Sequence, residues 1–210
     1  MKNRSIILET DMLNEAIQAL YLTEKMLRKV LNNIYYWKWA IVAIHNSLQG
    51  FMVCALSVGD GLDILDKKSM TKWLNAYHNN KSFSNEKLDC FSNLYAKIKS
   101  TAMKKYIYSK QYNSSAKQER KIKKLNELRN KFIHFKFSGW HVEVSGMPGI
   151  IEECVSIIEF LVFESGNMML TESKKEHEIK HLIANIKSEI SKINTKYIKI
   201  QKKEGGEKNK

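Results

Sequence analysis

Apolar residues recur at helical spacing through most of the chain. Between residues 9 and 33 they follow mixed three- and four-residue steps, at Leu13, Ile17, Leu20, Leu27 and Leu31. This spacing predicts one amphipathic helix, with Thr10 or Asp11 as its candidate cap. A second helix is expected from about residue 35 to residue 58. It is apolar on nearly all sides, which predicts a central position in the core.

Further helical patterns follow the GDGLD stretch at residues 59 to 63. Ser69 is the candidate cap of a short helix over residues 69 to 78. Long patterns are expected from residue 86 to 108 and from about residue 114 to 135. Residues 136 to 147 alternate apolar and polar positions between glycines, which predicts a small extended excursion, with a hairpin as one form.

Two helices complete the pattern. Pro148 suits the first turn of a helix that covers IIEECVSIIEFLVFE. A last amphipathic helix is expected over roughly residues 173 to 200, followed by a charged tail, residues 201 to 210, that should be disordered. Short loops favour antiparallel neighbours. We therefore predict an all-α fold, an antiparallel bundle of four or five long helices over residues 1 to 170, with a basic C-terminal helix and tail over residues 171 to 210.

Composition supports this fold class and adds a charge. The 210 residues hold 43% hydrophobic residues, one proline and nine glycines, which suits one helical domain better than a many-stranded one. The formal net charge is +13, and such a charge attracts polyanions, so nucleic acid is the natural candidate partner. A lysine-rich surface that merely keeps the chain soluble is the alternative, with about equal weight.

The cysteines and the apolar stretches bear on location. Three widely spaced cysteines without a CxxC pair point to a reduced protein, and the first residues lack the pattern of an export signal, so we expect a cytoplasmic protein. Residues 37 to 58 are nearly long enough to span a bilayer. Lys38, His45, Asn46, Ser47 and Gln49 interrupt them, so we expect a buried helix and no membrane association.

Three polar residues interrupt the apolar stripe of LNELRNKFIHF, residues 125 to 135. Asn130 and His134 lie four residues apart on one helical face, and Arg129 lies next to that face. Arginine offers a fork of donors suited to phosphate, and histidine can move a proton near neutral pH. Asparagine can orient either group. The three together are suited to RNA cleavage, in which a 2'-hydroxyl attacks its own phosphodiester without a metal.

The segment RNKFIHF, late in a long helix of a helical bundle, resembles the signature of the HEPN superfamily. That resemblance implies a metal-independent endoribonuclease with no cofactor, frequently a toxin of a toxin-antitoxin or anti-phage system. It implies catalytic roles for Arg129, Asn130 and His134. It also implies a homodimer whose two motifs face each other in one composite cleft, with an antitoxin protein as a candidate partner.

Other residues are candidates for supporting roles. Lys123, Lys124, Lys131 and Lys136 belong to a basic strip that can follow an RNA backbone, and a solvated helix face would look similar. Trp140 and His141 are candidates to line the cleft or stack on a base, although a tryptophan that covers the core is the commoner outcome. His45, Asn46 and Gln49 form either an internal hydrogen-bond network or a support beside the motif.

HEIKH, residues 177 to 181, matches the zinc-binding HExxH pattern. Lysines surround it and no third ligand follows at a typical offset, so we expect a solvated helix and no metal site. The competing functional class is a non-catalytic helical module that binds RNA or a partner protein. Burial and mutual pairing of Arg129 and His134 would favour that module, whereas their exposure would favour an enzyme.

Overall fold

The structure, a computed structural model, describes residues 5–83, 86–134, 137, 139–170 and 172–207, with side chains up to residue 202. Its helices are α1 (Met12–Val30), α2 (Tyr36–Leu56), α3 (Lys67–His78), α4 (Phe91–Lys97), α5 (Ala116–Ile133), α6 (Met147–Glu159) and α7 (Ser173–Glu207). A π turn, Phe160–Glu164, extends α6, and 3-10 turns lie at Leu62–Ile64 and Thr101–Met103. These residues form no strand, so the predicted all-α bundle is confirmed.

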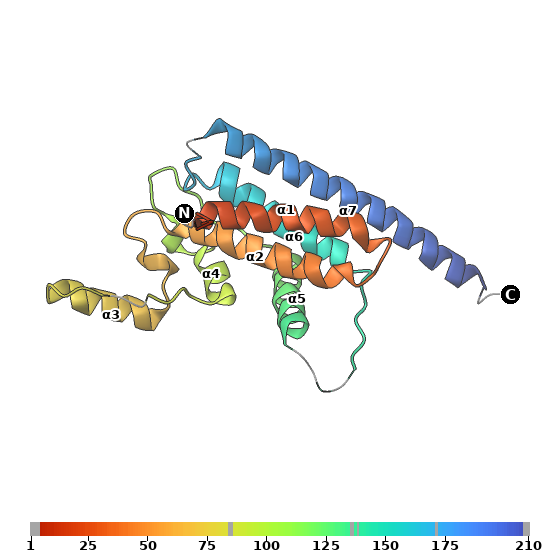
Figure 1. Ribbon diagram of the computed structural model, residues 1–210, viewed down its shortest axis with the longest axis horizontal. Helices are drawn as coiled ribbons and strands as arrows, with labels where there is room; N and C mark the ends of the chain where they lie inside the picture. The colour runs from red at the N-terminus through yellow and green to blue at the C-terminus, as the bar shows by residue number, and fades with distance from the viewer. Residues whose placement is uncertain (1–4, 84–85, 135–136, 138, 171, 208–210) are drawn as a thin grey trace.

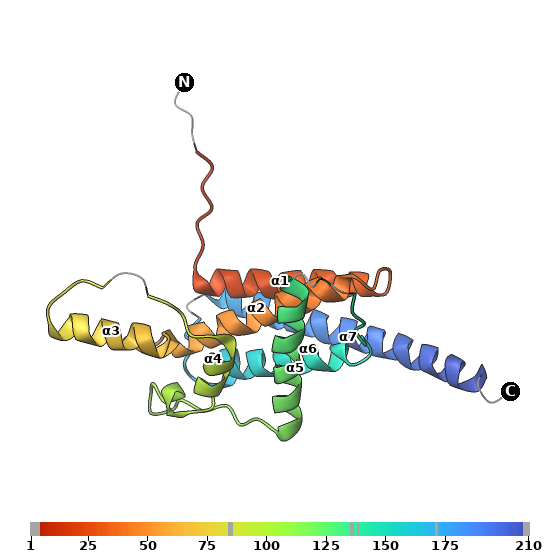
Figure 2. The same cartoon turned by 90° about the horizontal axis from the view of Figure 1, so that it is seen from below.

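Four helices run along the long axis of the molecule and one crosses them. Helices α1, α2, α6 and α7 lie roughly along this axis (Figure 1), whereas α5 runs across it in both views (Figure 2). Helix α3 projects from one end of the bundle. The crossing lets α5 touch both α2 and α6, and it carries the end of α5 to the edge of the bundle.

Helices α1 and α2 form the closest pair. Asp11 caps α1, because its carboxylate accepts a hydrogen bond of 2.7 Å from the backbone N–H of Asn14. Gly50 lies against Ala16 so closely that an added Cβ would meet the Ala16 Cβ at 2.7 Å. The Ser47 hydroxyl donates to the Ala16 carbonyl across the same contact, at 2.9 Å. A glycine inside α2 is therefore explained by helix packing.

Helix α2 forms the centre of the core, as its all-round apolar pattern predicted. Its fully buried large side chains are Trp37, Ile41, Ile44, Leu48, Phe51, Met52 and Leu56. Among the described helices, α2 alone is long and apolar enough to cross a membrane by length and composition, and 67% of its most apolar window is buried inside the protein. Core helices pass the same test, so this feature is weak evidence for a span.

Helix α5 is well specified by its own sequence. Ser115 and Gln118 form a capping box, in which each side chain accepts from the other's backbone N–H. Ile122, Leu125 and Leu128 face the core at helical spacing. The next helix, α6, carries proline in its first turn, as expected.

Several local predictions were wrong. The helix expected over residues 86 to 108 is limited to α4, because the Ser100 hydroxyl accepts from the Ala102 N–H and donates to the Lys97 carbonyl, which replaces helical bonds. Helix α3 begins earlier than expected, because Asp66 caps it by accepting from the Ser69 N–H at 2.7 Å. The small extended excursion predicted for residues 136–147 is present in the described part of this range, as a single segment without a hairpin.

The C-terminal helix is longer than predicted. Helix α7 continues through residues 201–207, which were expected to be disordered. Its apolar face packs on α1 and α6, and its buried isoleucines belong to the same core as the rest of the bundle. They are Ile179, Ile183, Ile186, Ile190 and Ile193. The division of the chain near residue 170 stays a prediction.

Candidate functional site

His134 lies at the point where α5 ends. Its backbone is extended, with φ −90° and ψ 121°, and its N–H donates to the Asn130 carbonyl at 3.2 Å. The side chain is exposed. Among the described residues no hydrogen bond or ion pair holds the imidazole. A proton-transfer group at an exposed helix end is accessible to a ligand.

Arg129 lies one turn earlier and is half-buried. Its Nη1 donates to the Asn130 side-chain oxygen at 3.0 Å, so the neighbouring residue orients the guanidinium. The Nε atom is buried and finds no hydrogen-bond partner in the described part of the chain. Because Nε is closed to solvent, an anion could reach this half-buried guanidinium only through its terminal N–H groups.

A buried histidine of α2, His45, lies near Arg129. The ring of His45 is 1% exposed and stacks on Phe91 of α4, with centroids 4.1 Å apart. Its Nε2 lies 3.1 Å from the side-chain oxygen of Asn126, whose amide nitrogen donates to the Ser92 hydroxyl at 3.3 Å. Nε2 therefore carries the ring proton, and the buried Nδ1 is an acceptor without a partner.

Burial lowers the pKa of His45 from 6.5 to about 4. The positive charge of Arg129 also lowers this pKa, against the opposing hydrogen bond that Nε2–H donates to the Asn126 side-chain oxygen. The ring is thus neutral at physiological pH. Arg129 lies close enough to His45 for its charge to act on the imidazole. Asn46, an exposed residue, lies near the same ring. Gln49 is half-buried and makes no hydrogen bond to this cluster within the described residues.

Arg129 and His134 do not meet within one chain. No hydrogen bond joins them in the described part of the structure, and a straight helix separates positions five residues apart by about 140°. Arg129 faces α2, whereas His134 lies at the rim of a separate pocket. Neither residue is fully buried and the two are not paired with each other.

The pocket beside His134, here called the aromatic pocket, has a volume of about 750 Å³. Its aromatic lining includes Tyr35, Trp37, Phe132 and Trp140. The predicted residues Lys131 and His141 also line it. The pocket opens between the α1–α2 turn, the end of α5 and the extended segment 140–144.

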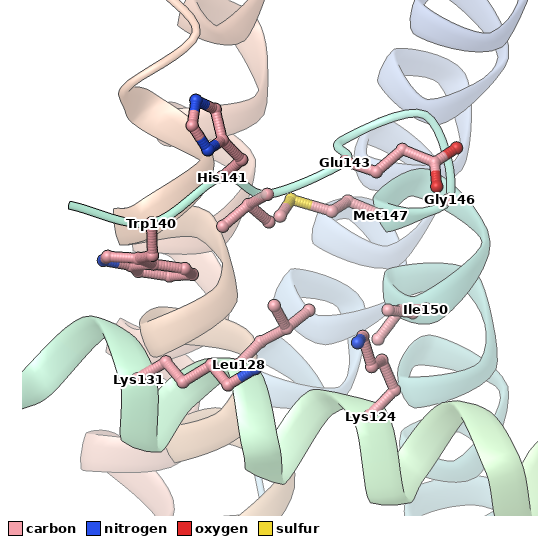
Figure 3. A pocket seen from close by; sticks show the side chains of 10 residues that line it. Lys124, Leu128, Lys131, Trp140, His141, Glu143, Gly146, Met147 and Ile150 are labelled. Atoms are coloured by element: carbon pink, nitrogen blue, oxygen red, sulfur yellow. The ribbon is translucent and has the colours of Figure 1, made fainter. Parts of the chain in front are cut away.

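A smaller hollow of about 220 Å³, here called the lysine pocket, adjoins the aromatic pocket and shares Lys131, Trp140, His141 and Val142 with it. Figure 3 shows Lys124 rising from α5 toward Ile150 and Lys131 lying along α5 beneath the segment that carries Trp140 and His141. Lys123 is exposed and lines neither hollow, and Lys136 lies outside the described residues. The structure thus brings four of the six predicted RNA-binding residues to one place.

Two contributors to the site were missed from sequence. Asn126 lies three and four residues before Arg129 and Asn130, so helical spacing alone could have placed it on their face. Tyr35 had no such signal, because its position in the aromatic pocket depends on the approach of the α1–α2 turn to residues 140–144, about a hundred residues later in the chain.

The HEIKH segment lies on exposed turns of α7. His177 and His181 are both exposed, and the His181 Nδ1 lies 3.3 Å from the Asn185 amide. Lys180 pairs with Glu176 at 2.5 Å. Within the described residues no group of three or more histidine, cysteine, aspartate or glutamate side chains is arranged to hold a metal ion.

Two of the three cysteines, Cys54 and Cys154, have thiols of low reactivity. Burial raises the pKa of Cys54 to about 11, and the pKa of the fully buried Cys154 also rises. Both thiols therefore stay protonated near neutral pH.

Comparisons with protein-family models, with curated proteins and with solved structures each find no match to this chain.

Proposed function

We propose that this protein is a metal-independent endoribonuclease of HEPN type. The observation that carries the proposal is the state of the motif on α5: His134 is exposed at the rim of a pocket, and Arg129 is half-buried and makes no hydrogen bond to His134. A purely structural pair would be buried and mutually bonded. Exposed lysines along the same helix supply the charge that RNA requires.

The reaction follows from the chemistry of these groups. The 2'-oxygen of the RNA attacks the adjacent phosphorus, and the bond from phosphorus to the 5'-oxygen breaks. A histidine removes the 2'-hydroxyl proton, and a histidine donates a proton to the leaving 5'-oxygen. The products are a 2',3'-cyclic phosphate and a 5'-hydroxyl. Arg129 would stabilise the negative charge of the pentacovalent phosphate, and Asn130 would hold the guanidinium through their 3.0 Å hydrogen bond.

The separation of the two groups supports a homodimer. Because Arg129 and His134 point in different directions from α5, one chain does not aim both at one phosphate. Two copies whose α5 ends face each other would supply two histidines, one as base and one as acid. The HEPN resemblance implies the same arrangement.

A non-catalytic module that binds RNA or a partner protein is the second candidate. One observation favours it: the arginine of the motif lies beside the internal pair of His45 and Asn126, where it has a packing role of its own. In that case Arg129 would order the contact between α2 and α5, and His134 would be a surface residue. An antitoxin-like protein is one candidate partner for such a surface.

The test is incubation of the purified protein with mixed cellular RNA in EDTA. We expect wild type to cleave RNA and leave cyclic-phosphate ends, and His134→Ala to lose at least a hundredfold in rate, because acid-base catalysis contributes about 10²–10⁴-fold. His177→Ala removes an exposed histidine from α7 and serves as the matched control. Circular dichroism reports whether each variant is folded.

The outcomes separate the two candidates. Cleavage by the His134→Ala variant at the wild-type rate would reject this histidine as the catalytic group. Activity abolished by EDTA would reject the metal-independent mechanism. If the protein is a growth-arresting toxin, its expression should slow cells, and a folded Arg129→Ala, His134→Ala double variant should not.

A further inference from the structure

The aromatic pocket leaves large apolar side chains open to solvent, although burying them would stabilise the folded protein. Tyr35 is 80% exposed and Ile34, which lines the same pocket, is 56% exposed. Scattered apolar residues are common on surfaces, but aromatic side chains gathered around one hollow mark a ligand site. The volume of about 750 Å³ lies within the range of roughly 300–1,000 Å³ typical of small-ligand pockets.

The walls of the pocket are held in place. Trp140 packs against Phe132 with ring centroids 5.2 Å apart, which ties the extended segment to α5. Trp37 is buried, and its indole N–H donates to the hydroxyl of Tyr197 on α7 at 2.7 Å. The C-terminal helix therefore fixes one wall of the pocket. A preformed aromatic site loses less entropy on binding than one that must be assembled.

The charge around the pocket is positive. Lys131 lines both the aromatic pocket and the lysine pocket, and Lys124 lines the lysine pocket. Neither lysine has an ion-pair partner among the described residues. Glu143 also lines the lysine pocket, and its carboxylate accepts from the Ser145 hydroxyl. In Figure 3 this carboxylate points away from Lys131 and Trp140, so the edge shared with the aromatic pocket is cationic.

We propose that the aromatic pocket is a nucleobase subsite for single-stranded RNA. An unpaired base would stack against Tyr35 and Trp140, and the phosphate next to it would lie at Lys131 and Lys124. Stacking on aromatic rings with cations along the backbone is the general mode of single-strand binding. A base in a duplex is already stacked and paired, so it cannot enter. This inference rests on RNA being the ligand, as in the proposed function.

The position of His134 gives the subsite a consequence for cleavage. His134 lines the rim of the same pocket, so a base held there would place a neighbouring phosphodiester close to this histidine. The protein would then cut next to an unpaired nucleotide. A second copy of the chain is the competing occupant of an exposed aromatic surface, and Lys131 favours a polyanion over an apolar segment.

The test measures binding without cleavage. The probe is a fluorescently labelled single-stranded RNA 12-mer with 2'-O-methyl sugars, which has no attacking hydroxyl, and its affinity for full-length protein is measured by anisotropy. We expect Tyr35→Ala to weaken binding about 5- to 150-fold, the range for loss of one base stack. Tyr35→Phe keeps the ring and should bind like wild type. Tyr77→Ala removes an exposed tyrosine from α3 and should also bind like wild type.

Tyr35 is exposed, so its removal should leave the fold intact, and Trp140→Ala provides a second variant whose folding is checked by circular dichroism. Unchanged affinity in Tyr35→Ala would overturn the subsite. A change in sedimentation of Tyr35→Ala without a change in probe affinity would instead assign the pocket to a second copy. A duplex of equal length should bind more weakly, and its affinity should be the same for wild type and Tyr35→Ala. If Tyr35→Ala weakened duplex binding as much as single-strand binding, the requirement for an unpaired base would be overturned.

The subsite and the enzyme can fail separately. Tyr35-dependent binding without any RNA cleavage would retain the subsite and reject the endoribonuclease. Cleavage that requires His134, together with binding and cleavage that do not change in Tyr35→Ala, would support the endoribonuclease and reject the subsite.

Discussion

The imidazole of His45 lies 3.1 Å from the side-chain oxygen of Asn126, and this contact joins the central helix α2 to α5 beside Arg129. It couples a buried titratable group to the helix that carries the proposed site. Because Arg129 is charged at all relevant pH values, a second positive charge on His45 would be repelled by it as well as poorly solvated.

The first prediction is a loss of stability in mild acid. The pKa of His45 falls from 6.5 to about 4 on folding. The unfolded chain therefore takes up a proton as pH falls through 6.5, and the folded chain does so only near 4, so the unfolded state binds more protons in between. The free energy of unfolding should drop by about 2 kcal/mol between pH 7 and pH 5 from this residue.

Urea denaturation at the two pH values measures this loss. His45→Gln should remove about 2 kcal/mol of the pH dependence, whatever its effect at pH 7. His177→Gln removes an exposed histidine from α7 and should retain the wild-type dependence. An equal pH dependence in His45→Gln and wild type would show that this histidine is not held neutral.

Helical spacing in the sequence predicted the elements that form the core. The apolar stripes of α1, α2, α5 and α6 were found because each helix buries one continuous face or, for α2, nearly its whole surface. Where local hydrogen bonds compete with the helix, the same reasoning failed. The Ser100 hydroxyl forms hydrogen bonds with the backbone just after α4, and these bonds prevent the helix from continuing, although the apolar periodicity extends further.

The site was predicted in part for a related reason. Arg129, Asn130 and His134 are close in sequence, so all three lie in the last turns of α5, although Arg129 and His134 point in different directions. Their neighbours depend on the way α5 crosses α2, and a periodic pattern carries no information about crossing direction. The meeting of Arg129 with His45 and of His134 with the aromatic pocket therefore required coordinates.

The second prediction concerns the close approach of α1 and α2. A methyl group at position 50 would lie 2.7 Å from the Cβ of Ala16, so the helices must move apart to accept it. We expect Gly50→Ala to lower the free energy of unfolding by roughly 1–3 kcal/mol, the usual cost of overpacking, despite the better helix propensity of alanine. The midpoint of urea unfolding measures the change.

Gly146→Ala is the matched control. A Cβ at this position meets no atom within 4 Å and the backbone is compatible with alanine, so the midpoint should stay within about 0.5 kcal/mol of wild type. If Gly50→Ala were equally neutral, the two helices would be packed more loosely than the contact with Ala16 indicates.

The third prediction concerns the salt dependence of RNA binding. Each lysine that contacts a phosphate releases a counterion, and for single strands this changes the slope of log affinity against log salt by about 0.7 per contact. Lys131→Gln and Lys124→Gln should each reduce the slope by about that amount for the 2'-O-methyl probe, and the double variant by about twice as much. Anisotropy titrations at several salt concentrations measure the slope. Lys72→Gln, an exposed lysine on α3, should keep the wild-type slope, and a Lys131→Gln variant that also kept it would place the RNA backbone away from the aromatic pocket.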